Sequence, residues 1–141
     1  MFDITKKRAS ETGVIDLKNG DGGMLYDDEG NQLSVTVYGP GSKIWQQADA
    51  ENNRRRNERI RKAGGNFTAA LDNVKDDHID FLVRVTISFD GWEYPAEKGK
   101  WPTQADMFRA AYSDDSIGFI RDHVFSEVRD WTAFTKGSAT S

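Results

Sequence analysis

The sequence predicts an α+β fold that is mainly α-helical, with a small N-terminal β-meander over about 13–38 followed by a bundle of about four helices. Apolar and polar side chains alternate just before residue 39, which is typical of a strand. Further along the chain, apolar residues recur every three or four positions, which is typical of helices. A length of 141 residues with 37% hydrophobic content is enough for one domain with a modest core.

The strand pattern is clearest at 33–38, where successive side chains would point to opposite faces of a sheet. Two earlier apolar segments, 13–17 and 24–26, are separated by turn-forming residues at 19–23. These three segments together predict the meander. So small a sheet is only marginally stable alone, so we expect its apolar face to pack on the helices. In the last strand, the side chains expected on that face are Leu33, Val35 and Val37.

The first helix is predicted over 43–63. Gly39-Pro40-Gly41 ends the preceding strand, and Ser42 is a suitable N-cap. Gly64-Gly65, which follows several basic residues, predicts the C-terminal end. Apolar side chains occur only near the start of this helix, so its second half has no stripe with which to bury itself. We expect that half to be solvated or docked on an acidic surface.

Apolar residues at helical spacing predict three further helices, at 66–88, 103–112 and 115–134. Asn66 is expected to cap the first of them, and Thr103 is expected to cap the second. The segment 81–89 contains several β-branched residues, so a strand competes with a helix there. The apolar spacing favours the helix.

The segment 90–102 is predicted to be a loop. It contains Trp92 and Trp101, two large side chains with no evident reason to be solvated, so we expect them to pin the loop to the core. The small and polar residues of 136–141 predict a disordered tail. Residues 1–135 are predicted to form a single domain, with a β-rich part over 1–40 and a helical part over 41–135.

The composition excludes several classes of protein. The chain has no cysteine, which excludes disulfide frameworks, thiolate metal sites and cysteine nucleophiles. No apolar run approaches the roughly 20 residues that span a bilayer, and the first eight residues lack the apolar stretch of a signal peptide. These features predict a soluble protein of a reducing cytoplasm with no membrane partner.

The sequence gives little support for catalysis. His78 and His123 lie on or beside apolar helix faces with no paired nucleophile, so packed or surface histidines are the favoured interpretation. Adjacent carboxylates such as Asp76-Asp77 favour helix caps and solvation over an acid–base pair. The glycine-rich segment 19–23 lacks the later ligands of a calcium loop, and Gly99-Lys100 lacks the glycine and the hydroxyl residue that a phosphate loop requires near Pro95 and at Trp101. We therefore expect a non-enzymatic protein with no cofactor and no metal.

The strongest compositional feature is a basic cluster at 54–62, which carries +5, while the rest of the chain carries −9 to give the net charge of −4. On a helix, four of its cations share roughly one face, with Arg56 and Arg61 beside them. The four are Arg54, Arg55, Arg59 and Lys62. Three interpretations remain open: a solvated face, docking to an acidic protein surface that could belong to a second copy, and nucleic-acid binding. Residues 51–66 contain no aromatic side chain that could stack on bases, which disfavours the third.

The succession of segments resembles a known family. A strand through Val35-Thr36-Val37-Tyr38-Gly39 leads to the arginine-rich helix, and the next helix ends in Phe89-Asp90-Gly91-Trp92 before Trp101-Pro102-Thr103. Further on, Ala111-Tyr112-Ser113-Asp114 precedes a last helix that contains Ile120-Arg121-Asp122-His123-Val124 and closes at Phe134. Over about 33–135, this order is similar to that of the tail assembly chaperones of long-tailed bacteriophages.

The resemblance implies a non-enzymatic assembly factor. Proteins of this family bind the long tape measure protein, keep it soluble and bring tail tube protein subunits to it. They act in the host bacterial cytoplasm and are absent from the mature virion. The alternative is a structural tail or head–tail connector subunit that stays in the particle, although only about 13–38 is predicted as strand. A small nucleic-acid-binding regulator is a third interpretation.

The family transfers no catalytic residue, so the partner-binding residues are a hypothesis from this sequence. A coating protein needs exposed apolar area for a helical client and charges for packing against other copies. We expect four apolar residues to contact partners: Ile44, Trp45, Ile120 and Val124. We expect the cluster cations to bind an acidic surface: Arg54, Arg55, Arg56, Arg59 and Lys62. Self-association through the same charges is also expected.

Overall fold

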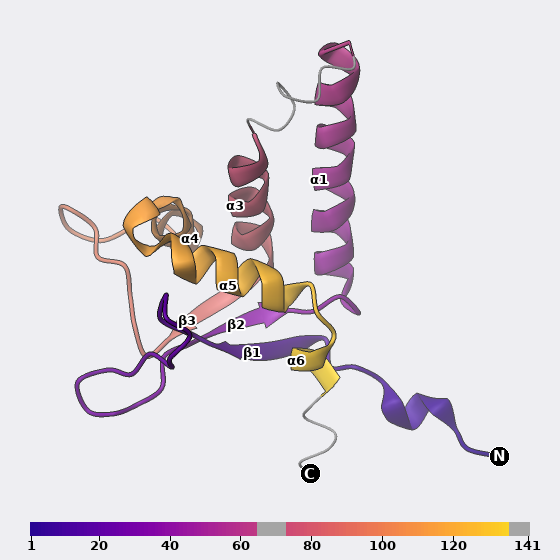
Figure 1. Ribbon diagram of the computed structural model, residues 1–141, viewed down its shortest axis with the longest axis horizontal. Coiled ribbons are helices and arrows are strands. Elements are labelled where there is room, and N and C mark those ends of the chain that lie inside the picture. The colour runs from indigo at the N-terminus through magenta and orange to yellow at the C-terminus, as the bar shows by residue number, and fades with distance from the viewer. Residues whose placement is uncertain (65–72, 136–141) are drawn as a thin grey trace.

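The computed structural model describes residues 1–64 and 73–135 and confirms the predicted α+β, mainly α, class. A three-stranded antiparallel sheet is covered on one face by helices, and its other face is open (Figure 1). Two predictions lie outside the described residues: the cap at Asn66 and the disordered tail at 136–141.

The sheet has the order β1 (Thr12–Asp16), β2 (Ser34–Tyr38), β3 (Thr86–Asp90). The predicted strands at 13–17 and 33–38 correspond to β1 and β2, but the predicted middle strand at 24–26 forms only isolated bridges. The third strand comes instead from 86–90, so the predicted helical end of 66–88 is wrong. Its β-branched residues pair with β2, where Val35 lies opposite Phe89. This long-range pairing decides the ambiguity between helix and strand.

Two helices rise from the sheet side by side (Figure 1). The first, α1 (Lys43–Lys62), agrees with the prediction to within one residue, and the Ser42 hydroxyl accepts a hydrogen bond from the Trp45 amide at 3.2 Å as its N-cap. The second, α3 (Val74–Val85), packs against α1. In Figure 1, the outer end of α1 extends beyond the other described helices.

Two more helices complete the cover of the sheet. The first, α4 (Gln104–Ser113), begins at the predicted cap, where the Thr103 hydroxyl accepts from the Asp106 amide at 3.1 Å. The short turn η2 (Asp115–Ile117) then leads into α5 (Gly118–Val128). The buried Tyr112 hydroxyl lies 2.8 Å from the Thr86 hydroxyl, which joins α4 to β3.

The predicted single helix at 115–134 is wrong, because α5 ends at Val128 and a separate turn, α6 (Thr132–Thr135), follows. The Asp130 carboxylate accepts from the Thr132 amide at 2.9 Å and starts that turn. Phe134 then folds back onto the sheet, where the Ser10 amide donates to its carbonyl at 2.7 Å. Its ring fills the space beside Gly13, where an added Cβ would lie 2.7 Å from a ring carbon.

The core draws on the strands and on the four long helices of the described residues. The strand residues predicted to face inward do so, since Val35 and Val37 are fully buried and Leu33 packs against them. The largest fully buried side chains are Tyr112, Phe81, Phe134, Leu17 and Leu82.

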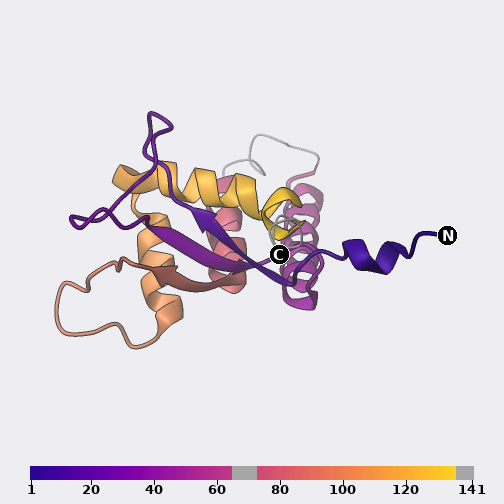
Figure 2. The same ribbon diagram turned by 90° about the horizontal axis from the view of Figure 1, so that it is seen from below.

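Two segments project from the packed sheet and helices: the N-terminal segment and the loop after β3. In Figure 2 the N-terminal segment, with its short turn η1 (Ile4–Lys7), projects away from the sheet. The loop after β3 carries the two predicted tryptophans. Trp92 pins it as expected, since its ring stacks on Phe89 at 3.9 Å and its indole N–H donates to the Ser34 carbonyl at 2.8 Å. Trp101 instead stacks on Tyr94 within the loop itself.

Candidate binding site

The structure divides the basic cluster of α1 into two sets. Arg55 and Arg59 point toward α3, where Arg55 Nη1 lies 2.8 Å from Asp80 Oδ2 and Arg59 forms two hydrogen bonds to Asp77. Asp80 also accepts from Arg109 Nη1 of α4 at 2.6 Å, so one carboxylate joins three helices. The acidic surface that receives these two arginines is therefore the chain's own α3.

The electrostatics of Asp80 reflect this arrangement. Partial burial acts to raise the pKa of its carboxyl, but the hydrogen bonds from Arg109 and Arg55 outweigh burial and hold the pKa below its ordinary value. The carboxylate consequently stays charged over the physiological pH range. Sequence analysis missed Asp77 and Asp80 as partners. The sequence did contain a signal for this pairing. Arg55 and Arg59 lie four positions apart on one helix, and Asp77 and Asp80 lie three positions apart on the next described helix, so each pair can share one helix face.

The second set of cations stays at the surface. Arg54 lies 2.6 Å from Glu51, and Arg61 lies 2.6 Å from Glu58, both as exposed pairs along α1. Arg56 donates to the neutral Asn53 side chain at 2.6 Å rather than to a carboxylate, and Lys62 is exposed. Among the predicted partner-binding cations, Arg54, Arg56 and Lys62 are therefore solvent-exposed.

The apolar part of the prediction needs correction. Val124 is fully buried and Ile120 is 8% exposed, so both belong to the core and offer no surface to a partner. Trp45 packs edge-on against Phe81, and its indole N–H donates to the Val128 carbonyl at 3.0 Å. Of the four predicted apolar contacts, Ile44 alone is exposed, at 40%.

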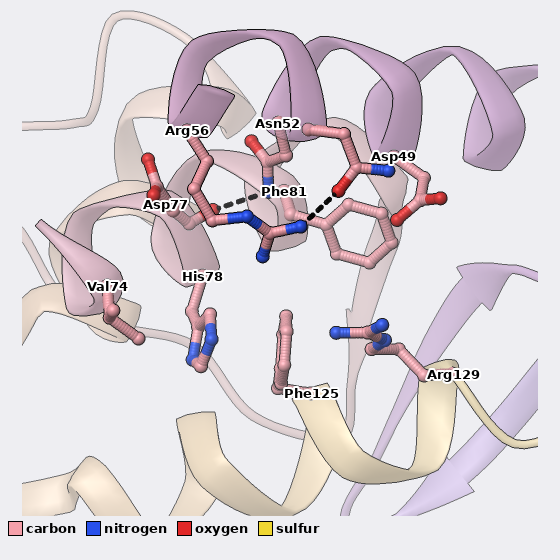
Figure 3. Close-up of a pocket in the computed structure, with 10 residues that line it drawn as sticks. Asp49, Asn52, Arg56, Val74, Asp77, His78, Phe81, Phe125 and Arg129 are labelled. Atoms are coloured by element: carbon pink, nitrogen blue, oxygen red, sulfur yellow. Dashed lines mark hydrogen bonds between the residues drawn. The ribbon is translucent and has the colours of Figure 1, made fainter. Parts of the chain in front are cut away.

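A pocket that sequence analysis did not predict lies between α1, α3 and α5 (Figure 3). One polar face of α1 lines it, because residues at this spacing share a side of a helix. Those residues are Asp49, Asn52, Asn53 and Arg56. The cavity volume of about 50 Å³ accommodates a few water-sized groups, such as a carboxylate.

An aromatic stack forms the opposite wall of this pocket. The His78 ring stacks on Phe125 with centroids 3.7 Å apart, and the Arg129 guanidinium lies 5.2 Å from the centroid of the same Phe125 ring. Figure 3 shows Phe125 between the other two side chains. Burial lowers the pKa of His78, and the nearby Arg129 lowers it further, so the imidazole is neutral at neutral pH.

The side-chain amide of Asn52 has only part of its hydrogen-bonding capacity satisfied. Its amide nitrogen donates to the Asp77 carbonyl at 2.9 Å, while its buried side-chain oxygen has no hydrogen-bond partner among the described residues. A buried acceptor without a donor costs free energy. The pocket thus offers a ligand the guanidinium groups of Arg56 and Arg129.

Polar, charged and aromatic side chains make up most of the lining of this pocket. Its lining residues include no serine, threonine, tyrosine or cysteine that His78 could activate. His123 lies elsewhere, with Nε2 3.0 Å from the Asp16 carbonyl. Across residues 1–64 and 73–135, no three histidine or acidic side chains are arranged to hold a metal ion.

Comparisons with known proteins assign no family to this chain. No protein-family model matches the sequence, and no curated protein or solved structure matches the chain either. Within the described part of the chain, no helix has the length and apolar character needed to cross a bilayer.

Proposed function

We propose that this protein is a tail assembly chaperone of a long-tailed bacteriophage, which binds the tape measure protein without catalysis, keeps it soluble and helps recruit tail tube subunits. The observation that supports a binding function is the pocket between α1, α3 and α5. There Arg56 and Arg129 flank a space that the described residues do not fill.

The chemistry of the pocket suggests how a client would be held. An acidic side chain on a client helix would accept hydrogen bonds from Arg56 and Arg129, which are strong because both partners are charged. Arg55 and Arg59 hold α1 against α3, so the face that carries Arg56 is preorganised before the client arrives.

Co-expression with the tape measure protein tests the proposal. We expect the soluble fraction of the tape measure protein to rise with this chain present and to fall back when Arg56→Glu and Arg129→Glu are combined. The matched control combines Arg61→Glu with Lys98→Glu, which makes the same total charge change at an exposed pair with Glu58 and in the exposed loop after β3. Equal solubility with and without this chain would reject the chaperone function.

A second experiment separates a chaperone from a structural tail or connector subunit. A chaperone leaves before the particle is complete, so mass spectrometry of purified virions should detect tail tube protein and no peptide of this chain. Stoichiometric recovery of its peptides from virions would instead establish the structural function.

A further inference from the structure

Strand β1 has one edge that pairs with no other strand among the described residues. The Gly39 amide donates to the Glu11 carbonyl, and the Leu17 amide donates to the Leu33 carbonyl, so the odd-numbered residues of this segment face β2. Because antiparallel ladders alternate, the backbone groups of Thr12, Val14 and Asp16 point the other way. At the two ends of this edge, the Ser10 amide bonds to Phe134, and the Asp16 carbonyl meets His123.

A groove of about 510 Å³ runs beside this edge, between β1 and the helices α5 and α6. Its acidic lining residues are Asp16, Glu127 and Asp130, and its one basic residue is Lys18. His123 also faces the groove. Asp130 accepts hydrogen bonds from Thr132. The groove therefore combines an open strand edge with an excess of negative charge, which suits a basic, extended segment.

The chain itself carries a segment of that chemistry. Residues 1–8, which we call the N-terminal arm, contain Lys6, Lys7 and Arg8 against the single acid Asp3. Two large apolar side chains of the arm are exposed, Phe2 at 66% and Ile4 at 73%. Such side chains at alternate positions match the period of a strand, in which they would share one face.

We propose that the N-terminal arm of a second copy of this chain binds in the groove and pairs with the outward edge of β1. The basic arm residues would lie near Asp16 and Glu127, and the arm backbone would bond to Val14 and Thr12. The short turn at Ile4–Lys7 must unwind for this pairing. That turn is held by exposed bonds, chiefly from Thr5 to the Asp3 carboxylate, which water replaces at little cost.

The direction of the arm favours a second copy over its own groove. The groove lies beside 14–18, toward the end of β1, whereas the arm leaves from the start of that strand and projects away from the body (Figure 1). The bond from the Ser10 amide to the Phe134 carbonyl fixes this departure point. Reciprocal exchange of arms between two copies would bury both edges and close a dimer.

Disulfide trapping tests the contact directly, because the chain has no cysteine of its own. Ile4→Cys and Thr132→Cys are prepared as two separate variants and mixed under mild oxidation. We expect a disulfide-linked heterodimer, and we expect little of it when Ile4→Cys is replaced by Ala96→Cys in the distant loop. A doubly substituted chain that cross-links only within itself would overturn the proposal.

Charge variants test the chemistry in solution. Lys6→Glu with Lys7→Glu should raise the dissociation constant of self-association at least about tenfold, because these residues then meet an acidic groove. Glu127→Lys in the same chain should restore much of that loss. The control is Lys98→Glu with Lys100→Glu, which changes charge equally on the loop after β3. A mass that is monomeric for the unaltered chain, or equal losses in both pairs of variants, would refute arm exchange.

Discussion

At the scale of single residues, the structure assigns different tasks to neighbouring arginines that are alike in sequence. Arg55 and Arg56 are adjacent, yet one holds α1 to α3 through Asp80 while the other faces the pocket between α1, α3 and α5. A helical step of about 100° between neighbours turns them to different surroundings. The sequence led us to expect that the basic cluster binds acidic groups. Which arginines pair within the fold and which line the pocket depends on where α3 packs.

Removing the shared carboxylate tests the structural part of this division. Asp80→Asn should lower the free energy of unfolding by about 2 kcal/mol, because Arg55 and Arg109 both lose their charged partner in a partly buried setting. Urea denaturation measures the change. Glu58→Gln, which breaks only an exposed pair, should cost less than about 0.5 kcal/mol. Similar losses in the two variants would mean that Asp80 is no more important than a surface acid.

His78 predicts a pH dependence with a definite sign. Burial lowers the pKa of His78 below its ordinary value of 6.5, so the folded protein binds fewer protons here than the unfolded chain. The stabilisation is complete above pH 6.5 and is lost as the pH falls through the lower folded pKa. The charged groups acting on the ring are Arg129, Asp122, Asp77 and Arg121.

His78→Phe keeps a ring for stacking on Phe125 and removes the titration. Melting temperatures measured at steps below pH 6.5 should fall more steeply for the unaltered protein than for this variant. Coincident curves would show that His78 makes no contribution to acid sensitivity. Asp80 contributes at lower pH, since its pKa is also depressed and its stabilisation disappears as the pH falls through that depressed pKa.

At the scale of elements, local signals predicted more than long-range ones. The caps at Ser42 and Thr103 were predictable because each depends on residues three positions away. The strand at Thr86–Asp90 was not, because its apolar spacing also suits a helix and its pairing partner lies about 50 residues earlier. The pocket was equally hidden, since it exists only where three separate helices meet.

The return of α6 to the sheet gives a test at this scale. An added Cβ at Gly13 would lie 2.7 Å from the Phe134 ring, so Gly13→Ala should displace α6 and lower the free energy of unfolding by about 2 kcal/mol. Gly20→Ala is the matched control, because nothing lies within 4 Å of its added Cβ. The effect of Gly13→Ala should shrink in a Phe134→Ala background, as expected for residues in contact. Strict additivity of the two changes would contradict this packing.

At the scale of the whole molecule, only some of the unevenly distributed charges form ion pairs within the fold. Arg55 and Arg59 find their partners on α3, but the basic N-terminal arm and the acidic groove beside β1 remain exposed. Short, partly buried ion pairs are screened weakly by salt, whereas association between exposed charges is screened strongly. Stability and self-association should therefore respond differently to ionic strength.

Raising sodium chloride from about 0.05 to 0.5 M shortens the screening length from about 14 Å to about 4 Å. We expect the melting temperature of dilute protein to change little, because the pairs that join α1 to α3 stay intact. Over the same range the proposed arm-exchanged dimer should dissociate, as measured by light scattering at fixed protein concentration. A chain that lacks residues 1–8 should show the same melting behaviour and no salt-dependent mass. Salt-insensitive association that survives this deletion would place the contact on an apolar surface elsewhere.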